Sequence, residues 1–301
     1  MTPPDEIADL FEAHRPRLVR LAYRMLGSLA EAEDVVQDAW LRWRDVDRTS
    51  VSAPSSFLSR IVTRLCLDQM KSARARRESY VGSWLPEPLL EEQEDDRGDD
   101  LTLTLMMALE RLSPLERAAF LLHDVFGVPL EEVAGTLHRE AAAVRQLAAR
   151  ARRHVRESRP RYPVERTEGD RIAQAFFAAA RSGDTDTLRT MLAETVVLQS
   201  DGGGKVQSFP NPIHGLDRVL RLFEGLSRKF GAEAFEMIQP MWIDGLPGYA
   251  SLERGQVLQI TALAIEEGRI ARIYITRNPD KLAHVARTLG LRGSQGAVPR
   301  R

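Results

Sequence analysis

The stretch SLAEAEDVVQDAWLRW, residues 28–43, predicts a helix with two different faces. Ser28, followed three residues later by Glu31, has the form of a capping box, which starts a helix. Apolar residues then recur with helical spacing, at Ala32, Val35, Val36, Ala39, Trp40 and Trp43. The other face carries Asp34 and Asp38, and like charges at this spacing repel by about a few tenths of a kcal/mol. From charge alone, a solvated face and a face that docks on a basic partner are equally good interpretations.

Helical patterns extend on both sides of this stretch, and residues 5–78 are expected to be helical throughout. Gly27 ends the helix before it, and Pro54-Ser55-Ser56 starts a third helix after a polar turn. One side of this third helix is apolar, and the opposite side and the C-terminal end are basic. The basic residues are Arg60, Arg64, Lys71, Arg74, Arg76 and Arg77. Cations at a helix C-terminus also favour the helix dipole, so this basic end is expected in a purely structural helix too.

Composition predicts a multidomain globular protein, because 301 residues with 43% hydrophobic and 28% charged residues fill two or three compact units. The net charge of −1 hides strong segregation. Residues 87–100 contain eight acidic residues and one arginine, whereas residues 139–166 contain nine arginines and three glutamates. Residues 61–78 carry five basic and two acidic residues. Two basic stretches separated by an acidic one indicate localised contacts with phosphates.

The segment 79–100 interrupts the helical pattern and is expected to be a linker. Trp84-Leu85-Pro86-Glu87-Pro88 cannot continue a helix, and the acidic run after it repels itself. Residues 101–158 are predicted to be helical again, with a capping box at Ser113-Pro114-Leu115-Glu116. A short helix over 130–137, a turn at His138-Arg139-Glu140 and a longer basic helix form a helix-turn-helix pattern.

From residue 168 to 290 the pattern predicts an α+β domain, with helices first and then a curved antiparallel sheet. The expected strands are Thr195–Gln199, Val206–Phe209, Phe235–Ile243, Val257–Ile265 and Ile270–Thr276.

Other features of the sequence restrict where the protein is found in the cell and which chemistry it can carry out. A single cysteine, Cys66, excludes an internal disulfide. No apolar run approaches the roughly 20 residues that span a bilayer, and Met1–Glu6 lacks the order of a signal peptide. We therefore expect a cytoplasmic protein with no membrane partner, no metal and no cofactor.

The motif Asp34-x-x-Gln37-Asp38-x-Trp40-Leu41 resembles the polymerase-binding helix in the second conserved region of bacterial RNA polymerase sigma factors. The resemblance implies that Asp34, Gln37, Asp38 and Leu41 contact core RNA polymerase. It also implies that the third helix meets the melting −10 promoter element, where the six basic residues named above hold the DNA backbone.

The helix-turn-helix resembles the fourth conserved region of sigma factors, which reads the −35 promoter element. Arginine suits both bidentate guanine contacts and phosphate contacts. The resemblance implies that promoter DNA is bound by Arg139, Arg145, Gln146, Arg150, Arg152 and Arg153.

Two such regions in this order resemble the extracytoplasmic-function (group IV) sigma factors. Three further stretches are similar to the SigJ-like subgroup, whose members carry a SnoaL-like (NTF2-like), cone-shaped C-terminal domain. They are Trp84–Pro88, Asp201-Gly202-Gly203-Gly204-Lys205 and Asn278-Pro279-Asp280-Lys281-Leu282. The resemblance implies a domain that modulates activity in cis, so a dedicated anti-sigma factor is not expected. Trp84, Asp201–Lys205 and Asn278–Lys281 are expected to make the regulatory contact.

Two other functions remain open on the sequence. One is a one-component helix-turn-helix regulator with a ligand-sensing NTF2-like domain, which would need no polymerase-binding helix. The other is an NTF2-like hydrolase or isomerase that uses Asp201 and His214 as an acid–base pair. Three consecutive glycines at 202–204 also permit a phosphate cradle, although a flexible turn fits the spacing better. We expect a sigma factor and no enzyme.

Overall fold

The structure is a computed structural model that describes residues 4–46, 51, 53–78, 80–90, 103–156, 164–254 and 256–291, with the side chains of 4–7 and 72–78 left aside. Its contacts divide the chain into two compact units. The first consists of Met1–Glu78 and Met106–Ser158, and the second of Ser79–Leu105 and Arg159–Arg301. The segment between the two helical modules of the first unit therefore packs with the C-terminal domain.

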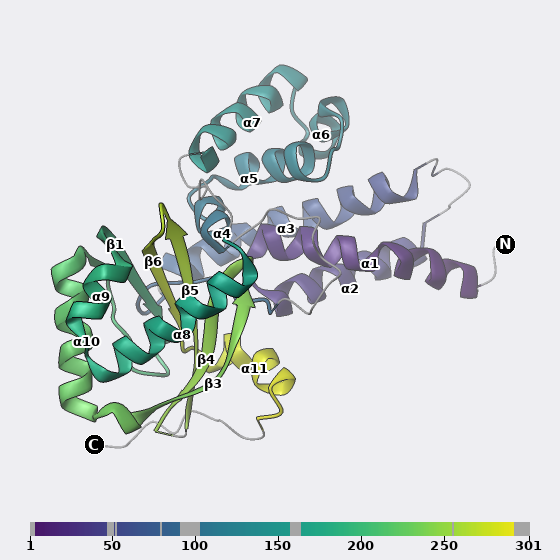
Figure 1. Ribbon diagram of the computed structural model, residues 1–301. Coiled ribbons are helices and arrows are strands. Elements are labelled where there is room, and N and C mark those ends of the chain that lie inside the picture. Colours follow the sequence, from purple (N-terminus) through teal and green to yellow (C-terminus); the bar gives the residue numbers. More distant parts are fainter. Residues whose placement is uncertain are drawn as a thin grey trace. The chain divides into compact units, whose positions relative to one another are not determined.

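The first helical module is built from three long helices that lie side by side (Figure 1): α1 (Pro4–Leu26), α2 (Leu29–Arg44) and α3 (Pro54–Glu78). The Ser28 hydroxyl accepts a hydrogen bond from the backbone N–H of Glu31 at 3.3 Å, as the capping motif predicts. Gly27, before this cap, has a φ of 72°. The predicted apolar stripes form the buried core of the module, which includes Leu18, Leu21, Met25, Val36, Ala39, Trp43, Leu58, Val62 and Cys66.

The second helical module contains α4 (Leu103–Leu109), α5 (Pro114–Phe120), the π-helical turn η2 (Leu121–Val125), α6 (Leu130–Leu137) and α7 (Ala141–Arg156). Both hydrogen bonds of the Ser113–Glu116 capping box are present at the start of α5. His138 ends α6 in the left-handed conformation, with a φ of 51° and a ψ of 51°. A non-glycine residue in this region costs about 1–2 kcal/mol. The sharp helix-turn-helix geometry is thus kept without a glycine in the turn.

One buried arginine ties the two modules together inside the first unit. Arg117 of α5 is 1% exposed and donates a hydrogen bond to the carbonyl oxygen of Met25, near the end of α1, at 2.7 Å. Its guanidinium also pairs with Glu110. Arg17 of α1 donates to the carbonyl oxygen of Phe126, beyond η2, at 3.2 Å. Because these bonds end on backbone carbonyls near helix ends, they satisfy acceptors that the helices themselves leave free.

The C-terminal domain is a mixed six-stranded sheet with helices on both faces (Figure 1). Its helices are α8 (Arg166–Ser182), α9 (Thr185–Met191), α10 (Leu216–Phe230), the 3₁₀ turn η3 (Ala232–Ala234) and α11 (Pro279–Thr288). Its strands are β1 (Leu192–Asp201), β2 (Ile213–His214), β3 (Phe235–Ile243), β4 (Leu246–Glu253), β5 (Val257–Glu266) and β6 (Arg269–Thr276). The strand order is β2-β1-β6-β5-β4-β3, in which β1 and β6 are parallel and the other neighbours antiparallel.

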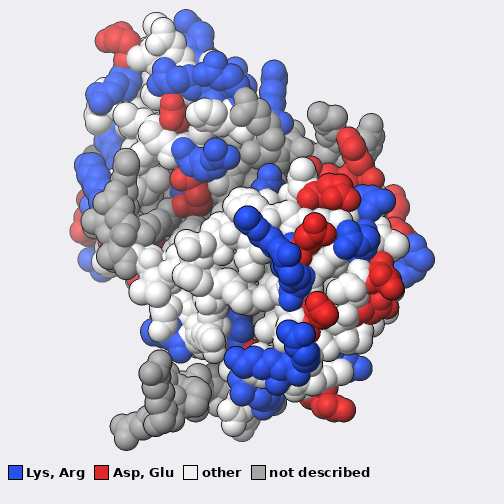
Figure 2. Space-filling view, turned by 90° about the vertical axis from the view of Figure 1, so that its left-hand side faces the viewer, with Lys and Arg blue, Asp and Glu red and all other residues white. Residues whose placement is uncertain are grey.

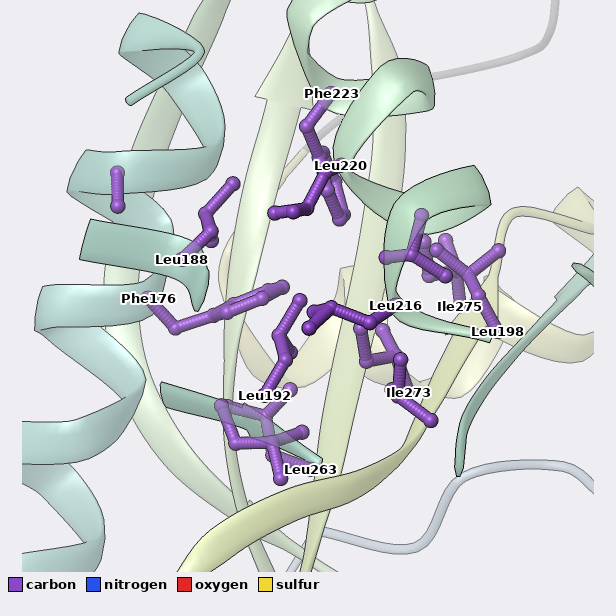
Figure 3. Packing of buried hydrophobic residues seen from close by; sticks show 14 of the residues in the cluster. Phe176, Leu188, Leu192, Leu198, Leu216, Leu220, Phe223, Leu263, Ile273 and Ile275 are labelled. Atoms are coloured by element: carbon purple, nitrogen blue, oxygen red, sulfur yellow. The ribbon is translucent and has the colours of Figure 1, made fainter. Parts of the chain in front are cut away.

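Side chains fill the space between the sheet and helices α8–α10 (Figure 3). Phe176 of α8 meets Phe223 of α10 edge to face, with ring centroids 5.6 Å apart. Leu263 and Ile273 project toward them from β5 and β6. This face of the sheet is therefore a packed core. Helix α11 lies on the opposite face, and Leu90 of the linker forms a β-bridge to Ile243 at the end of the edge strand β3.

The predicted fold class is confirmed: two helical modules precede an α+β domain. Three details of the sheet differ from the prediction. The sheet is mixed and not antiparallel throughout, because β1 and β6 are parallel. The segment Val206–Phe209 is wrong as a strand, because the chain turns back at Gly202, whose carbonyl accepts from the N–H groups of Lys205 and Val206. The short strand of that region is β2, and β4 is a strand that the sequence analysis missed.

Candidate nucleic-acid interface and linker-binding site

The four residues expected to contact polymerase form one exposed face of α2. Asp34, Gln37, Asp38 and Leu41 follow each other at intervals of three or four residues and are all exposed. Leu41 is 43% exposed, which is unusual for a large apolar side chain in this chain. Asp34 and Asp38 have no hydrogen bond or ion pair with any residue that the structure describes. The face therefore combines unpaired negative charge with an exposed apolar residue.

The basic residues of α3 divide into three groups. Arg60 is exposed, and Lys71 forms an exposed ion pair with Asp68 at 2.8 Å. Arg64 instead donates hydrogen bonds to the carbonyl oxygens of Gly135 and Thr136, both at 3.3 Å, in the last turn of α6. The side chains of the remaining three, Arg74, Arg76 and Arg77, lie outside the described residues. In this structure Arg64 thus caps a helix of the other module.

The basic residues of α7 and of the turn before it also fall into groups, according to whether their side chains are paired. Arg152 pairs with Asp124 at 2.6 Å, and Arg150 pairs with Glu116 at 2.7 Å, so both fasten α7 to α5 and η2. Burial opposes ionisation of Glu116, but hydrogen bonds from Arg150 and Ser113 outweigh it and lower its pKa.

Arg145, Gln146 and Arg153 are exposed and have no partner among the described residues. Arg139, in the turn, donates to the carbonyl oxygen of its neighbour His138. Basic side chains gather on this module at the top of Figure 2. Of the residues expected to bind DNA from this module, Arg145, Gln146 and Arg153 are consequently those whose side chains are unoccupied in the described part of the chain.

The stretches expected to make a regulatory contact meet at a buried carboxylate. Asp201, at the end of β1, is 0% exposed. Its Oδ1 accepts from the Tyr80 hydroxyl at 2.6 Å and from the N–H of Gly203 at 3.0 Å. Its Oδ2 accepts from the N–H of Leu85 at 2.9 Å and from Lys281 Nζ at 2.7 Å. One side chain thereby joins the linker, the glycine loop and α11.

Lys281 and Asn278 complete this contact from α11. Lys281 Nζ donates to the carbonyl oxygen of Leu85 and lies 4.2 Å from the ring centroid of Trp84, within cation–π distance. Asn278 donates from Nδ2 to the Tyr80 hydroxyl at 2.8 Å and caps α11 by accepting from the N–H of Asp280. Burial and the hydrogen bond to Asp201 raise the pKa of Tyr80. We call Tyr80, Trp84, Leu85, Asp201, Asn278 and Lys281 the linker clasp.

The glycine loop packs against the residues of this clasp. A Cβ at Gly203 would lie 2.3 Å from Asn278 Nδ2, and Gly203 has a φ of 61°, so a side chain is excluded on two grounds. A Cβ at Gly204 would lie 3.2 Å from Val81 of the linker. Lys205 forms an exposed ion pair with Asp280 at 2.6 Å. The loop therefore lies against both α11 and the linker.

A second group of contacts holds the linker further along, and the sequence analysis did not find it. The backbone N–H of Asp244 donates to the carbonyl oxygen of Leu89 at 2.9 Å, and the Leu89 N–H donates to the carboxylate of Asp244 at 3.1 Å. His284 of α11 contacts the carbonyl oxygen of Pro88 at 2.7 Å. Asp244 has a positive φ of 44° in the β3–β4 turn. No short-range pattern identifies these partners, because they lie more than 150 residues apart in the chain.

The acid–base pair considered for an enzyme is not formed. His214 pairs with Val197 across β1 and β2, and Asp201 lies four residues further along β1, where it binds the linker. Asp201 is thus committed to a structural contact.

Within the described residues, no helix is long and apolar enough to cross a membrane.

Comparison with known protein families identifies the two helical modules. Sigma-70 region 2 matches residues 10–76, and Sigma-70, region 4 matches residues 102–155. The chain belongs to the extracytoplasmic-function (ECF) RNA polymerase sigma factors.

The similarity extends beyond these modules to the C-terminal domain. The chain is 36% identical over 287 residues to the ECF RNA polymerase sigma factor SigJ of Mycobacterium tuberculosis, covering 90% of this chain and 91% of that protein. It is 34% identical over 298 residues to the probable ECF RNA polymerase sigma factor SigI of the same species, covering 96% and 99%. The crystal structure of M. tuberculosis SigJ superimposes with a TM-score of 0.73 at 32% identity, covering 92% of this chain and 98% of that one. These relatives do not favour a one-component regulator.

Proposed function

We propose that this alternative sigma factor recruits core RNA polymerase through the exposed α2 face, reads promoter DNA through α3 and α7, and is regulated in cis by the linker clasp. Transcription initiation is the function of the family to which the chain belongs. RNA polymerase works in the cytoplasm, and we place the chain there as well. The observation that carries the proposal is the α2 face, on which two unpaired carboxylates are followed one turn later by an exposed leucine.

The α2 face fits a basic protein partner because its charges are unsatisfied within the described part of the chain. Unpaired acids on a helix add repulsion and no stability. A complementary basic surface would turn that repulsion into attraction and would also speed association. Leu41, at the C-terminal end of this face, adds exposed apolar area to it.

The polymerase contact is tested by a charge reversal, Asp34→Lys with Asp38→Lys. Both residues are exposed, so the variant should fold with an unchanged circular dichroism spectrum. It should lose co-purification with core enzyme, whereas the matched reversal Asp186→Lys, at an exposed acidic residue of α9, should retain it. Retained binding by the α2 variant would refute the assignment.

For promoter binding we assign base contacts to Arg145 and Gln146 and phosphate contacts to Arg139 and Arg153. Arg150 and Arg152, which are occupied by Glu116 and Asp124, hold α7 in position for these contacts. On α3 we assign phosphate contacts to Arg60 and Lys71, and we propose the same role for Arg74, Arg76 and Arg77. Arg64 reaches DNA once it leaves the α6 carbonyls.

The clasp supports regulation in cis because the linker between the DNA-binding modules is held by the C-terminal domain itself. Asp201 and Lys281 are both buried, and together they bind both backbone polar groups of Leu85. A domain that fixes the linker restricts how the two modules can separate on a promoter. We infer that this hold takes the place of a dedicated anti-sigma factor.

Run-off transcription with purified core enzyme tests the regulatory role. Asp201→Asn should change promoter output several-fold while leaving the affinity for core polymerase unchanged. A titration of core enzyme in the same buffer separates the two effects. Equal output from this variant and the unmodified chain would mean that the linker clasp does not regulate transcription.

A further inference from the structure

The side of α11 that faces away from the linker borders a groove with a volume of about 550 Å³. The groove lies within the C-terminal domain and is lined by residues of the glycine loop, the start of β5 and α11. Its volume falls in the range of about 300–1,000 Å³ that is typical of small-molecule sites. It is separate from the packed core of Figure 3, which lies on the other face of the sheet.

The lining of the groove is amphipathic and carries a surplus of positive charge. Val257, Leu258 and Ala283 supply apolar surface. Lys205, Arg277 and Arg287 bring three cations, against the one carboxylate of Asp280. Arginine holds a carboxylate with two parallel hydrogen bonds, and such charge-assisted bonds are about twice as strong as neutral ones.

The three cations differ in how strongly they are already engaged. Arg277 is largely buried and paired with Glu253. Lys205 is paired with Asp280 across the mouth of the groove, but the two side chains are 55% and 62% exposed, so that pair is weak. Arg287 is exposed and bonds only the carbonyl oxygen of Ala283 among the described residues, at 3.4 Å. Arg287 and Lys205 are therefore the cations that an incoming anion can reach.

Helix α11 has the groove on one side and the linker clasp on the other. Ala283, Ala286 and Arg287 line the groove. Lys281 and His284, on the opposite side of the same helix, bind Leu85 and Pro88 of the linker. A ligand that draws Lys205 from Asp280 changes the contacts at the first turn of the helix whose N-cap, Asn278, binds Tyr80.

We propose that this groove binds a small amphipathic carboxylate, a molecule with one carboxylate and an apolar body, and that α11 transmits its occupancy to the linker clasp. The carboxylate lies between Arg287 and Lys205, and the apolar body lies against Val257, Leu258 and Ala283. The coupling part rests on the proposed regulatory role of the clasp, whereas the binding part does not.

Isothermal titration calorimetry of the full chain with octanoate tests the binding part. Octanoate should bind at one saturable site with a dissociation constant of roughly millimolar or tighter. Acetate, which lacks the apolar body, and octanol, which lacks the charge, should not saturate. Arg287→Gln should weaken octanoate binding by about tenfold, because it removes a charge-assisted hydrogen bond.

Two further variants serve as filling test and control. Ala283→Phe should abolish binding by filling the groove at an exposed helix position. Arg218→Gln, at an exposed arginine of α10 outside the groove, should bind like the unmodified chain. The proposal is overturned if octanoate fails to saturate, if octanol binds equally well, or if Arg287→Gln and Arg218→Gln have the same affinity.

Run-off transcription with octanoate tests the coupling. Output should change with saturating octanoate in the unmodified chain and stay constant in Arg287→Gln. If octanoate binds and output stays constant while Asp201→Asn still alters transcription, coupling through α11 is wrong and the regulatory clasp stands. If neither octanoate nor Asp201→Asn alters output, the proposed regulatory function itself fails.

Discussion

Replacing Lys281 with methionine removes a cation that faces the buried carboxylate of Asp201 in the linker clasp. Methionine keeps most of the apolar stem of the side chain but loses the ammonium group and its contacts. These include the hydrogen bonds to Asp201 Oδ2 and to the carbonyl oxygen of Leu85, and the cation–π contacts with the rings of Trp84 and Tyr80. The change therefore isolates the charge from the packing.

The expected magnitude follows from burial. Removing one partner of a buried ion pair costs about 3–5 kcal/mol, because the other charge stays buried without compensation. Asp201 keeps the donors of Tyr80, Leu85 and Gly203, so the lower end of this range applies. A loss of about 3 kcal/mol corresponds to roughly two orders of magnitude in the equilibrium for opening the clasp.

Hydrogen exchange at the Leu85 amide measures this opening directly, since that N–H is bonded to Asp201 in the closed clasp. We expect exchange to accelerate by about a hundredfold in Lys281→Met, whereas amides in the helix–sheet core of Figure 3 keep their protection. Lys229→Met, at an exposed lysine of α10 outside both the clasp and the groove, is the matched control. The Lys229 ammonium lies 5.0 Å from the centroid of the neighbouring Phe230 ring, a contact that is worth about 0.5–1 kcal/mol at an exposed site.

Comparing the exchange rate of the Leu85 amide in the two lysine variants tests whether the buried pair holds the linker. If the Leu85 amide exchanges within threefold of the same rate in both variants, the buried pair does not hold the linker, and the energetic argument is wrong. Acceleration that extends equally to the core of the domain would mean that Lys281 stabilises the whole domain and not the clasp.

Three other predictions concern the remaining contacts. Arg145→Ala should weaken binding to cognate promoters by about 1–3 kcal/mol, and so lower transcription from them, with unchanged thermal unfolding. Arg152→Ala should instead lower the melting temperature, because Arg152 pairs with Asp124. If both variants change the response to a series of −35 substitutions identically, the assignment of different roles to the two arginines is wrong. Glu116 has a lowered pKa, so its contribution to stability is present above about pH 4.5 and is lost as the pH falls below that value. The melting-temperature difference between Glu116→Gln and the unmodified chain should therefore shrink with acidification, and a constant difference would contradict the assignment. Gly203→Ala should open the clasp, seen as faster exchange at Leu85, because its Cβ would meet Asn278.

Local signals in the sequence were sufficient for the helices but not for all of the sheet. The capping motifs at Ser28 and Ser113 predicted helix starts that the structure contains, because caps depend on residues three positions apart. Strand β4 was missed because Pro247 and Gly248 are poor strand residues. Gly248 is nevertheless needed there, since a Cβ would lie 2.0 Å from the carbonyl oxygen of Thr261 on β5.

The candidate sites show the same division between local and long-range information. The spacing of Asp34 and Asp38 was enough to place both on one exposed face. The partners of Arg64 and Arg152 lie 28 to 72 residues away in the chain, so helical spacing alone could not separate free arginines from paired ones. The glycine loop and the late Asn278 stretch were expected to make a contact, but their partner Tyr80 was not identified.

The C-terminal unit is discontinuous in the chain, and this has a consequence for how such a protein evolves. Leu85, Leu89 and Leu90 precede the helix-turn-helix in sequence but bind residues that follow it. Appending a sheet domain to a two-module ancestor would not produce this arrangement unless the upstream segment changed as well. Conversely, a nonsense mutation after residue 158 would remove Asp201 and Lys281, which bind the backbone N–H and carbonyl oxygen of the buried Leu85. Loss of either segment would therefore leave backbone polar groups and buried side chains of the other without the partners that they have here.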